Sequence, residues 1–185
     1  MSRRSTGFDR WVAALRIREA LGHVDAKGRV CDLGCGVDSL IFEHLPPGGL
    51  RAGVDYQKPL PRRGALLVQA DLLGGVPLRA ESFDAVTLLA VIEHLTEPER
   101  TLAEAHRILA PGGRLVLTWP SASVDLILAV VSRIGLVSRE MECGHHQPRR
   151  PVAEWAALLA ELGFRDVRHR TFELGLNHLM VATRR

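Results

Sequence analysis

Long hydrophobic runs and aromatic side chains are both scarce in this chain of 185 residues. No wholly apolar run exceeds six residues, as in Leu126 to Val131, whereas a membrane-spanning helix needs about 20. Aromatic residues make up 5% of the sequence, which leaves few platforms on which nucleic-acid bases could stack. The sequence therefore predicts no transmembrane segment and argues against a nucleic-acid partner.

Cysteine and charge of one sign are scarce as well. Two of the three cysteines, Cys31 and Cys35, fall inside one predicted strand and turn, which argues against a disulfide framework and for a reducing compartment. The formal net charge is only +3, and arginine pairs are scattered rather than gathered in one stripe, as expected for solvated surface. The first residues lack the uncharged apolar core of an export signal. We therefore expect a cytoplasmic protein.

Apolar residues are plentiful, at 46% of the chain, and 185 residues can bury one sizeable core but hardly two. We expect a single domain over residues 1–185. Its first helix should end near Gly22, and we interpret residues 1–28 as a helical cover over the domain. Four apolar residues share one face of this helix: Phe8, Trp11, Val12 and Leu15.

Strand and helix patterns alternate after this cover, which predicts an α/β fold with a mostly parallel, Rossmann-like sheet and helices on both faces. The predicted parallel strands lie near 29–32, 50–54, 66–70, 84–89 and 114–118. The clearest helices lie near 39–45, 98–109 and 152–162. A turn at 111–113 separates helix from strand, and two last strands near 165–172 and 177–183 form an antiparallel hairpin at the sheet edge.

Residues 119–150 interrupt the alternation and are too long for an ordinary connection. We interpret them as a lid or an acceptor-binding insertion. The stretch from Val124 to Val137 is too apolar to be a solvated helix. Burial in the core or in a homodimer contact would cover it, and so would a hydrophobic acceptor or peripheral contact with a membrane surface.

The most informative stretch runs from Val30 to Gly36, Val-Cys-Asp-Leu-Gly-Cys-Gly, and is followed by Gly53-Val54-Asp55. It predicts a strand, a glycine turn, a helix and a second strand that ends in a carboxylate. Glycines let the backbone approach a ligand closely, and an acid at the second strand end can accept both hydroxyls of a ribose. This pattern indicates a nucleoside-cofactor site.

Five blocks in this order resemble the class I S-adenosylmethionine-dependent methyltransferases, in particular the small type 11-like domain. They are Val30 to Gly36, Gly53 to Asp55, Ala70-Asp71-Leu72, Ser82 to Leu95, and Arg107 to Val116. The resemblance runs from about residue 28 to 120 and implies a seven-stranded sheet with a reversed last strand. It also implies S-adenosyl-L-methionine as the cofactor.

The resemblance assigns cofactor roles residue by residue. Those expected around the methionine part are Asp32, Gly34, Cys35 and Gly36. Asp55 would hold the ribose hydroxyls, and the residues expected beside adenine are Tyr56, Asp71 and Leu72. Ala90 and Val91 would lie beside the sulfonium. Asp38 stands where the family often has a third glycine, and it brings a second carboxylate to the turn.

Two other readings of the glycine turn stay open. A nicotinamide-dinucleotide fold also has a glycine-rich first turn and an acid about twenty residues on, but this chain lacks its third glycine. A cofactor-binding module or degenerate homologue would hold S-adenosylmethionine without transferring a methyl group. Turnover against a real acceptor would separate the enzyme from this module.

The sequence does not identify the methyl acceptor. The Asn/Asp-Pro-Pro-aromatic tetrad of amino-group nucleic-acid methyltransferases is replaced by Leu89-Ala90-Val91-Ile92, which argues against base methylation of that type. We predict no metal site, because no oxygen-ligand cluster suits magnesium and the loop with Cys143, His145 and His146 lacks a fourth zinc ligand. We therefore expect metal-free O- or N-methylation of a small-molecule or lipid-like acceptor.

Histidine is the natural candidate for a base if the acceptor is a hydroxyl. His94 follows the segment predicted beside the sulfonium, where it is either a base or a packing residue. His145 and His146 lie in a turn from Cys143 to Pro148 that could return across the strand ends. Adjacent side chains point apart, so at most one of this pair should act, and we favour His146.

Overall fold

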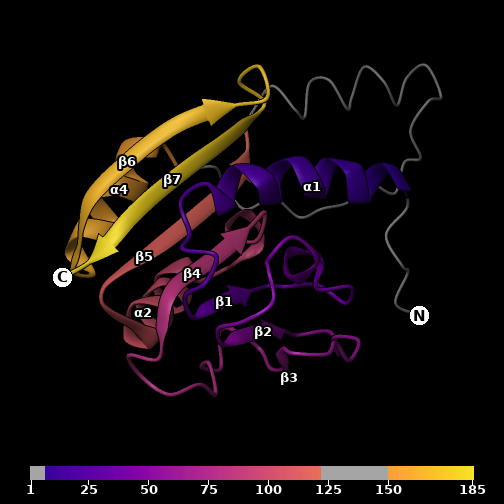
Figure 1. Ribbon diagram of the computed structural model, residues 1–185. Helices are drawn as coiled ribbons and strands as arrows, with labels where there is room; N and C mark the ends of the chain where they lie inside the picture. The colour runs from indigo at the N-terminus through magenta and orange to yellow at the C-terminus, as the bar shows by residue number, and fades with distance from the viewer. Residues whose placement is uncertain (1–6, 122–149) are drawn as a thin grey trace.

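Seven strands form one mixed sheet in the computed structural model, which describes residues 7–121 and 150–185 (Figure 1). The strands are β1 (Val30–Leu33), β2 (Arg51–Asp55), β3 (Leu66–Gln69), β4 (Phe83–Leu89), β5 (Leu109–Pro120), β6 (Phe164–Phe172) and β7 (Asn177–Arg184). Their order in the sheet is β3-β2-β1-β4-β5-β7-β6. The first five run parallel, and β7 runs antiparallel to both neighbours. The predicted fold class, with its antiparallel final hairpin, is confirmed.

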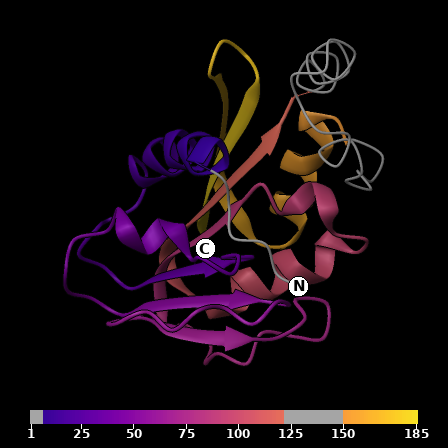
Figure 2. The same ribbon diagram turned by 90° about the vertical axis from the view of Figure 1, so that its right-hand side faces the viewer.

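Helices cover both faces of the sheet. The described helices are α1 (Gly7–Leu21), α2 (Pro98–Ile108) and α4 (Val152–Glu161), with the short 3-10 helices η1 (Leu40–Glu43) and η2 (Ile92–His94). Figure 2 shows α1 on one face and α2 with α4 on the opposite face. The edge formed by the carboxyl ends of the parallel strands is therefore bordered by helices on both faces of the sheet.

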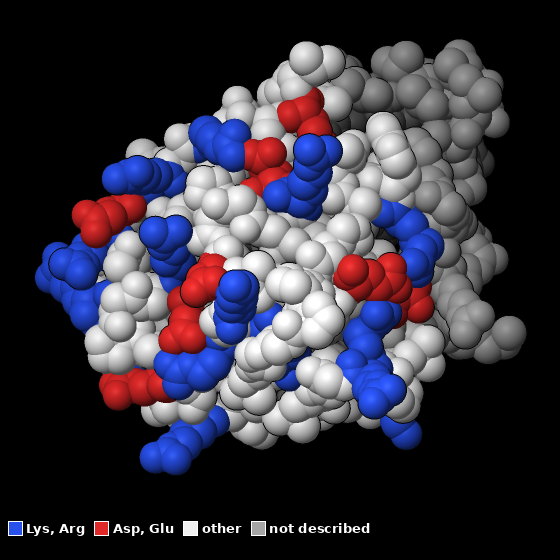
Figure 3. Space-filling view, viewed as in Figure 1, with Lys and Arg blue, Asp and Glu red and all other residues white. Residues whose placement is uncertain are grey.

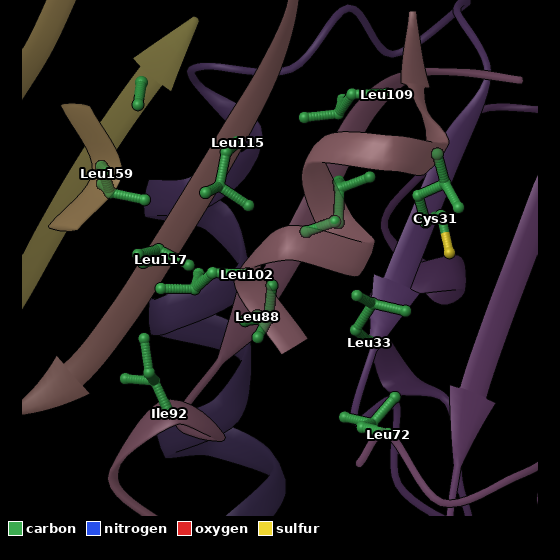
Figure 4. Close-up of a cluster of buried hydrophobic side chains, with 14 of the residues drawn as sticks. Cys31, Leu33, Leu72, Leu88, Ile92, Leu102, Leu109, Leu115, Leu117 and Leu159 are labelled. Atoms are coloured by element: carbon green, nitrogen blue, oxygen red, sulfur yellow. The ribbon is translucent and has the colours of Figure 1, made fainter. Parts of the chain in front are cut away.

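Alternating side chains of the strands fill two apolar clusters. In β5, Leu115 and Leu117 pack with residues of α2 and α4 in the larger cluster (Figure 4), whereas Val116 packs beneath α1. This is the period of two that a strand buried on both faces requires. The larger cluster extends to Leu33 and Ile92 at the carboxyl edge. The residues that follow β1 and β4 are therefore supported by packed apolar side chains.

The helix predicted at 39–45 is not an α-helix. The chain forms only the four-residue 3-10 helix η1 there, preceded by Ser39 in a left-handed conformation with φ of 47°. Pro46, Pro47 and two glycines follow at once, and prolines prevent the turn from growing into an α-helix. The site therefore lacks the long helix whose amino terminus would attract an anion.

The apolar face predicted for the first helix is buried only in part, since Val12 and Leu15 are half-buried. Trp11 is 59% exposed, whereas Ile17 and Ala20 are buried against the sheet. Ala13 and Arg16 lie on the same inward side, because they line a cavity together with Ile17. When α1 packs across the sheet, it therefore turns inward a face that mixes apolar residues with an arginine, and not its more apolar face.

The turn predicted at 111–113 is instead an irregularity within strand β5. β5 begins directly after α2 and extends from Leu109 to Pro120. Phe83 pairs with Leu109, and the next pair is Ala85 with Arg114, so the proline and glycines between them bulge away from β4.

Most of the predicted insertion at 119–150 lies outside the described residues. In the part of the chain that the structure describes, no helix is both long and apolar enough to span a bilayer. Figure 3 shows basic and acidic side chains interspersed over the α1 face.

Candidate functional site

All ten residues predicted to surround the cofactor line two adjoining cavities at the carboxyl edge of the sheet. A cavity of about 290 Å³, here the glycine-turn cavity, contains Asp32, Gly34, Cys35 and Gly36. A second cavity of about 680 Å³, the strand-end cavity, contains Asp55, Tyr56, Asp71, Leu72, Ala90 and Val91. Gly34 lines both cavities. The fold therefore brings together residues from four separate chain segments.

The glycine turn is packed tightly against the end of β4. Gly34 has φ of +80°, and a Cβ built on it would lie 2.3 Å from Cγ2 of Val91. Only glycine fits this position without a shift of Val91. Ala90 itself has φ of 55°, a conformation that non-glycine residues rarely adopt and that often marks functional sites.

The carboxylate of Asp55 is fixed by the backbone around it. Its Oδ2 accepts a hydrogen bond from Gly36 N at 2.8 Å, and its Oδ1 accepts one from Gln57 N at 2.8 Å. The residue is 6% exposed and lines the strand-end cavity. Each oxygen keeps a further lone pair, so the carboxylate can accept one bond per oxygen from a diol.

Asp32 carries a carboxylate that is costly to ionise. The residue is 5% exposed, and burial raises its pKa to about 7, with a smaller rise from the charge of Asp55 and an opposing effect of the Thr87 hydrogen bond. Thr87 Oγ1 donates that bond to Oδ1 at 2.5 Å. A cation in the glycine-turn cavity would stabilise the ionised form.

Arg16 of α1 supplies a cation to the same cavity, and sequence reasoning missed it. Its Nε is buried and has no hydrogen-bond partner in the described part of the chain. Burial lowers the pKa of Arg16, while the carboxylates of Glu93 and Glu173 raise it. Asp32 and Arg16 thus present opposite charges to one small cavity, as a zwitterionic amino acid requires. The only signal was an arginine at the spacing of Ala13, Ile17 and Ala20, a face that sequence alone did not select.

Asp38 also lines the glycine-turn cavity. Its Oδ2 lies 3.9 Å from Arg10 of α1, and its backbone oxygen accepts a bond from Arg62 at 2.9 Å. The second carboxylate predicted for this turn is therefore partly balanced by a cation.

A third cavity of about 360 Å³, here the tryptophan cavity, adjoins the strand-end cavity. Leu95 and Thr96 line both. Trp119 of β5 and Trp155 of α4 form one wall, with ring centroids 6.3 Å apart and planes tilted by 53°. The guanidinium of Arg150 lies 5.2 Å from the Trp155 ring centre. The tryptophan cavity can hold a ring-sized apolar group.

The histidines predicted as bases are only partly located. His94 lines the strand-end cavity, and its Nε2 lies 3.9 Å from Glu93 Oε1. His145 and His146 fall outside the described residues. Across residues 7–121 and 150–185, no group of three or more histidine, cysteine, aspartate or glutamate side chains could hold a metal ion.

Comparisons with known proteins identify the family of this chain. A family model described as a methyltransferase domain matches residues 31–117. The ubiquinone biosynthesis O-methyltransferase of Xanthomonas oryzae pv. oryzae is 30% identical, over 86% of this chain and 72% of that protein. The demethylmenaquinone methyltransferase of Thermus thermophilus is 29% identical, over 86% of this chain and 84% of that protein. A SAM-dependent methyltransferase from Archaeoglobus fulgidus shares the fold at a TM-score of 0.70 and 16% identity, over 95% of this chain and 94% of that one.

Proposed function

Because the chain belongs to the class I S-adenosylmethionine-dependent methyltransferases, we propose that it methylates an oxygen or nitrogen of a small-molecule or lipid-like acceptor without a metal ion. The observation that carries the proposal is the meeting of two cavities at Gly34. One holds an opposite pair of buried charged groups, and the other holds an acid that can accept two hydroxyls. Together they fit the two ends of the cofactor.

In the glycine-turn cavity, Asp32 would pair with the cofactor's ammonium and Arg16 with its carboxylate. The four-residue η1 is too short to provide an anion-binding helix terminus, so we assign the cofactor's carboxylate to Arg16. Cys35 and Gly36 would pack against the methionine chain. This assignment pairs each buried charge with a group of opposite sign.

In the strand-end cavity, Asp55 would accept both ribose hydroxyls. Tyr56 is 69% exposed and would cover one face of adenine, with Asp71 and Leu72 at its edge. Ala90 and Val91 would flank the sulfonium.

S-adenosylmethionine supplies a methyl group on a positively charged sulfur, which an acceptor atom can displace in line. Positioning by the protein can then lower the barrier by up to about 7 to 11 kcal/mol, so few catalytic side chains are needed. His94 and His146 remain the candidates for a base, with His145 as the less favoured of the pair.

The acceptor side is supported by the tryptophan cavity. The relatives from X. oryzae and T. thermophilus carry names of quinone-biosynthesis enzymes, and ring acceptors suit a wall formed by Trp119 and Trp155. We therefore favour an acceptor with an aromatic or quinone-type ring.

Isothermal titration calorimetry with S-adenosylhomocysteine, 5′-methylthioadenosine and NAD tests the cofactor assignment. We expect saturable binding of the first two and none of NAD. Arg16→Met should weaken S-adenosylhomocysteine about tenfold or more, equal to about 1.4 kcal/mol, and leave 5′-methylthioadenosine unaffected because that ligand lacks the amino-acid end. Arg18→Met, an exposed arginine of the same helix, is the control. Tight NAD binding without S-adenosylhomocysteine binding would reject the proposal.

A methyl-transfer screen over metabolite extracts, read out as S-adenosylhomocysteine released, separates the enzyme from a module that only holds the cofactor. Turnover with any extract fraction supports the enzyme. Cofactor binding without turnover across soluble and lipid fractions would favour the degenerate homologue.

A further inference from the structure

A fourth cavity, of about 470 Å³ and here called the β7 groove, lies along the last strand of the chain. It shares no lining residue with the glycine-turn, strand-end or tryptophan cavities, so it belongs to neither the cofactor nor the acceptor proposed above. Figure 1 shows α1 beside the hairpin of β6 and β7, and α4 behind that hairpin. The α1 side of β6 therefore stays open to solvent in the described part of the chain.

Strand register gives the β7 groove a floor of short side chains between walls of arginine. Leu179, Val181 and Thr183 alternate onto one face of β7 and line the groove, and Leu179 packs in the cluster beneath α1. Arg114 of β5 pairs with Thr183, and Arg168 of β6 pairs with Val181. Because cross-strand partners share a face, the two arginines rise on opposite sides of β7. The strands that carry them are about 10 Å apart, twice the spacing of neighbouring strands.

The β7 groove carries an excess of positive charge. Its lining contains three arginines and one carboxylate, namely Arg114, Arg168, Arg170 and Asp166. Asp166 Oδ2 lies 3.8 Å from Nε of Arg165, an arginine outside the lining. Glu19 of α1 pairs with Arg170. Each acid of this region therefore has a cation of its own, and the charges of the other two arginines are left over.

Arg114 and Arg168 form no ion pair with a carboxylate among residues 7–121 and 150–185. Arg114 Nη1 donates to the backbone oxygen of His23 at 3.2 Å, and Arg168 is exposed on β6. Burial lowers the pKa of His23, and the charge of Arg114 lowers it further. The electrostatic field at this wall is therefore positive, and His23 lines the groove as a neutral imidazole at pH 7.

The arrangement of donors favours phosphate over carboxylate. A guanidinium binds either anion through two parallel hydrogen bonds. A carboxylate has two oxygens in one plane, whereas a phosphate has oxygens in tetrahedral directions. The groove offers cations from two opposite walls and the Thr183 hydroxyl from its floor, which suits the tetrahedral group. Its volume lies in the range of sites for small organic molecules, so the phosphate can carry an organic part.

We propose that the β7 groove binds a phosphate monoester, with Arg114 and Arg168 holding the phosphate from opposite sides. This inference goes beyond the proposed function, since the groove is separate from the cavities assigned to methyl transfer. The same phosphate oxygens belong to soluble phosphorylated molecules and to the headgroup of phosphatidic acid, and the experiments distinguish these two sources.

The ligand class is tested by NMR titration of the full chain, with amide chemical shifts as the readout. The probes are inorganic phosphate, glycerol 3-phosphate and succinate at one ionic strength, which keeps screening equal. We expect glycerol 3-phosphate to saturate with a Kd of about 1 mM or tighter, and succinate to bind at least about fivefold more weakly. Equal affinity for succinate, or no saturable shift with either phosphate, would overturn the inference.

Variants of Arg168 separate a built site from diffuse attraction. Arg168→Gln should weaken glycerol 3-phosphate at least about tenfold, because a charged hydrogen-bonding partner is lost. Arg168→Lys should weaken it at least about threefold, since an ammonium keeps the charge but cannot form the paired bonds of a guanidinium. Arg100→Gln removes an exposed arginine of α2 on the opposite face and should leave the affinity unchanged. All three should melt within about 3 °C of the parent.

Two results would overturn the site. One is full affinity in Arg168→Lys, and the other is an equal loss in Arg168→Gln and Arg100→Gln. Either would show that net charge, and not the β7 groove, attracts the phosphate.

Vesicle flotation identifies the source of the phosphate. The parent and Arg168→Gln are mixed with phosphatidylcholine vesicles that contain or lack phosphatidic acid. Binding that requires phosphatidic acid, is lost in Arg168→Gln and is displaced by glycerol 3-phosphate supports a lipid headgroup. Binding of glycerol 3-phosphate without such flotation supports a soluble ligand. Loss of S-adenosylhomocysteine binding would leave these results unchanged, because the two sites share no residue.

Discussion

The cofactor side and the acceptor side of this protein are built in different ways. On the cofactor side, each predicted residue lies at or just beyond the end of a strand among β1 to β4, and the parallel sheet alone brings these strand ends together. On the acceptor side, the tryptophan cavity is formed by Leu95, Trp119 and Trp155, which come from a loop, a strand and a helix far apart in sequence. Local motifs encode the first site, while long-range packing assembles the second.

The largest expected effect concerns Asp32 and the pH dependence of stability. Burial raises its pKa from 3.8 to about 7 in the folded protein, so between these values the folded state holds a proton that the unfolded state has lost. Stability should therefore fall as pH rises from about 4 to about 7, by up to about 4 kcal/mol. Asp32→Asn should flatten this slope in urea unfolding of the ligand-free protein. Parallel pH profiles for parent and variant would contradict the assignment of a costly buried carboxylate.

The glycine turn offers a matched pair. Gly34→Ala should cost about 3 kcal/mol or more of unfolding free energy, because a new Cβ meets Val91 and the backbone has positive φ. Gly36→Ala meets nothing within 4 Å and should cost only about 1 kcal/mol for its positive φ. Gly36→Ala should nevertheless weaken S-adenosylhomocysteine, since its methyl group enters the cavity. Equal stability losses in chemical denaturation would show that the turn is not packed against β4.

Asp55 tests whether the end of the second strand holds the ribose. Asp55→Ala should weaken S-adenosylmethionine by about 2 kcal/mol or more, because a charged acceptor of two hydroxyl bonds is lost. It should weaken 5′-methylthioadenosine as well, in contrast to the Arg16 variant. Asp25→Ala removes a carboxylate that caps a loop away from both cavities, where Oδ1 accepts from Lys27 N at 2.9 Å, and is the control. Unchanged affinity on calorimetry would reject the assignment.

The smallest expected effect lies on the acceptor side, in the histidine pair beside Trp119. His169 Nε2 lies 2.9 Å from His178 Nδ1, and the His178 ring stacks on Trp119 at 5.1 Å. Burial lowers the pKa of His169 below its usual 6.5, so this residue stabilises the fold above pH 6.5 and loses that contribution as pH falls through the lowered value. The loss should stay below about 1 kcal/mol because the group is exposed. His169→Gln should remove it from melting curves between pH 5 and 7.5, and a larger residual slope would point to other groups.

The contrast between the two sides also explains which expectations held. The glycine turn and the acids at the ends of β2 and β3 could be predicted because each belongs to a short pattern that the sheet topology brings together. No α-helix forms at 39–45, although the apolar spacing predicted a helix there. The prolines that follow and the short connection to β2 prevent it, and apolar spacing takes neither of them into account. Arg16 was missed because the apolar pattern of α1 favoured a different face, with Trp11 on it. The placement of Thr118 and Asn177 on one face could not be predicted from the sequence, because it depends on the pairing of β5 with β7.

By itself, the sequence determined the order of strands and helices, the glycine turn, and the acids near the carboxyl ends of β1 and β2. These features depend on contacts between near neighbours in the chain, where turn geometry and hydrophobic period are decisive. The tertiary structure alone decided which face of α1 turns inward, and so that Arg16 meets the same cavity as Asp32. It also decided that Thr118 and Asn177, on the paired strands β5 and β7, both face the α1 side. Such contacts join residues from different helices and strands, and no local pattern specifies them because their free energy arises only when the layers pack.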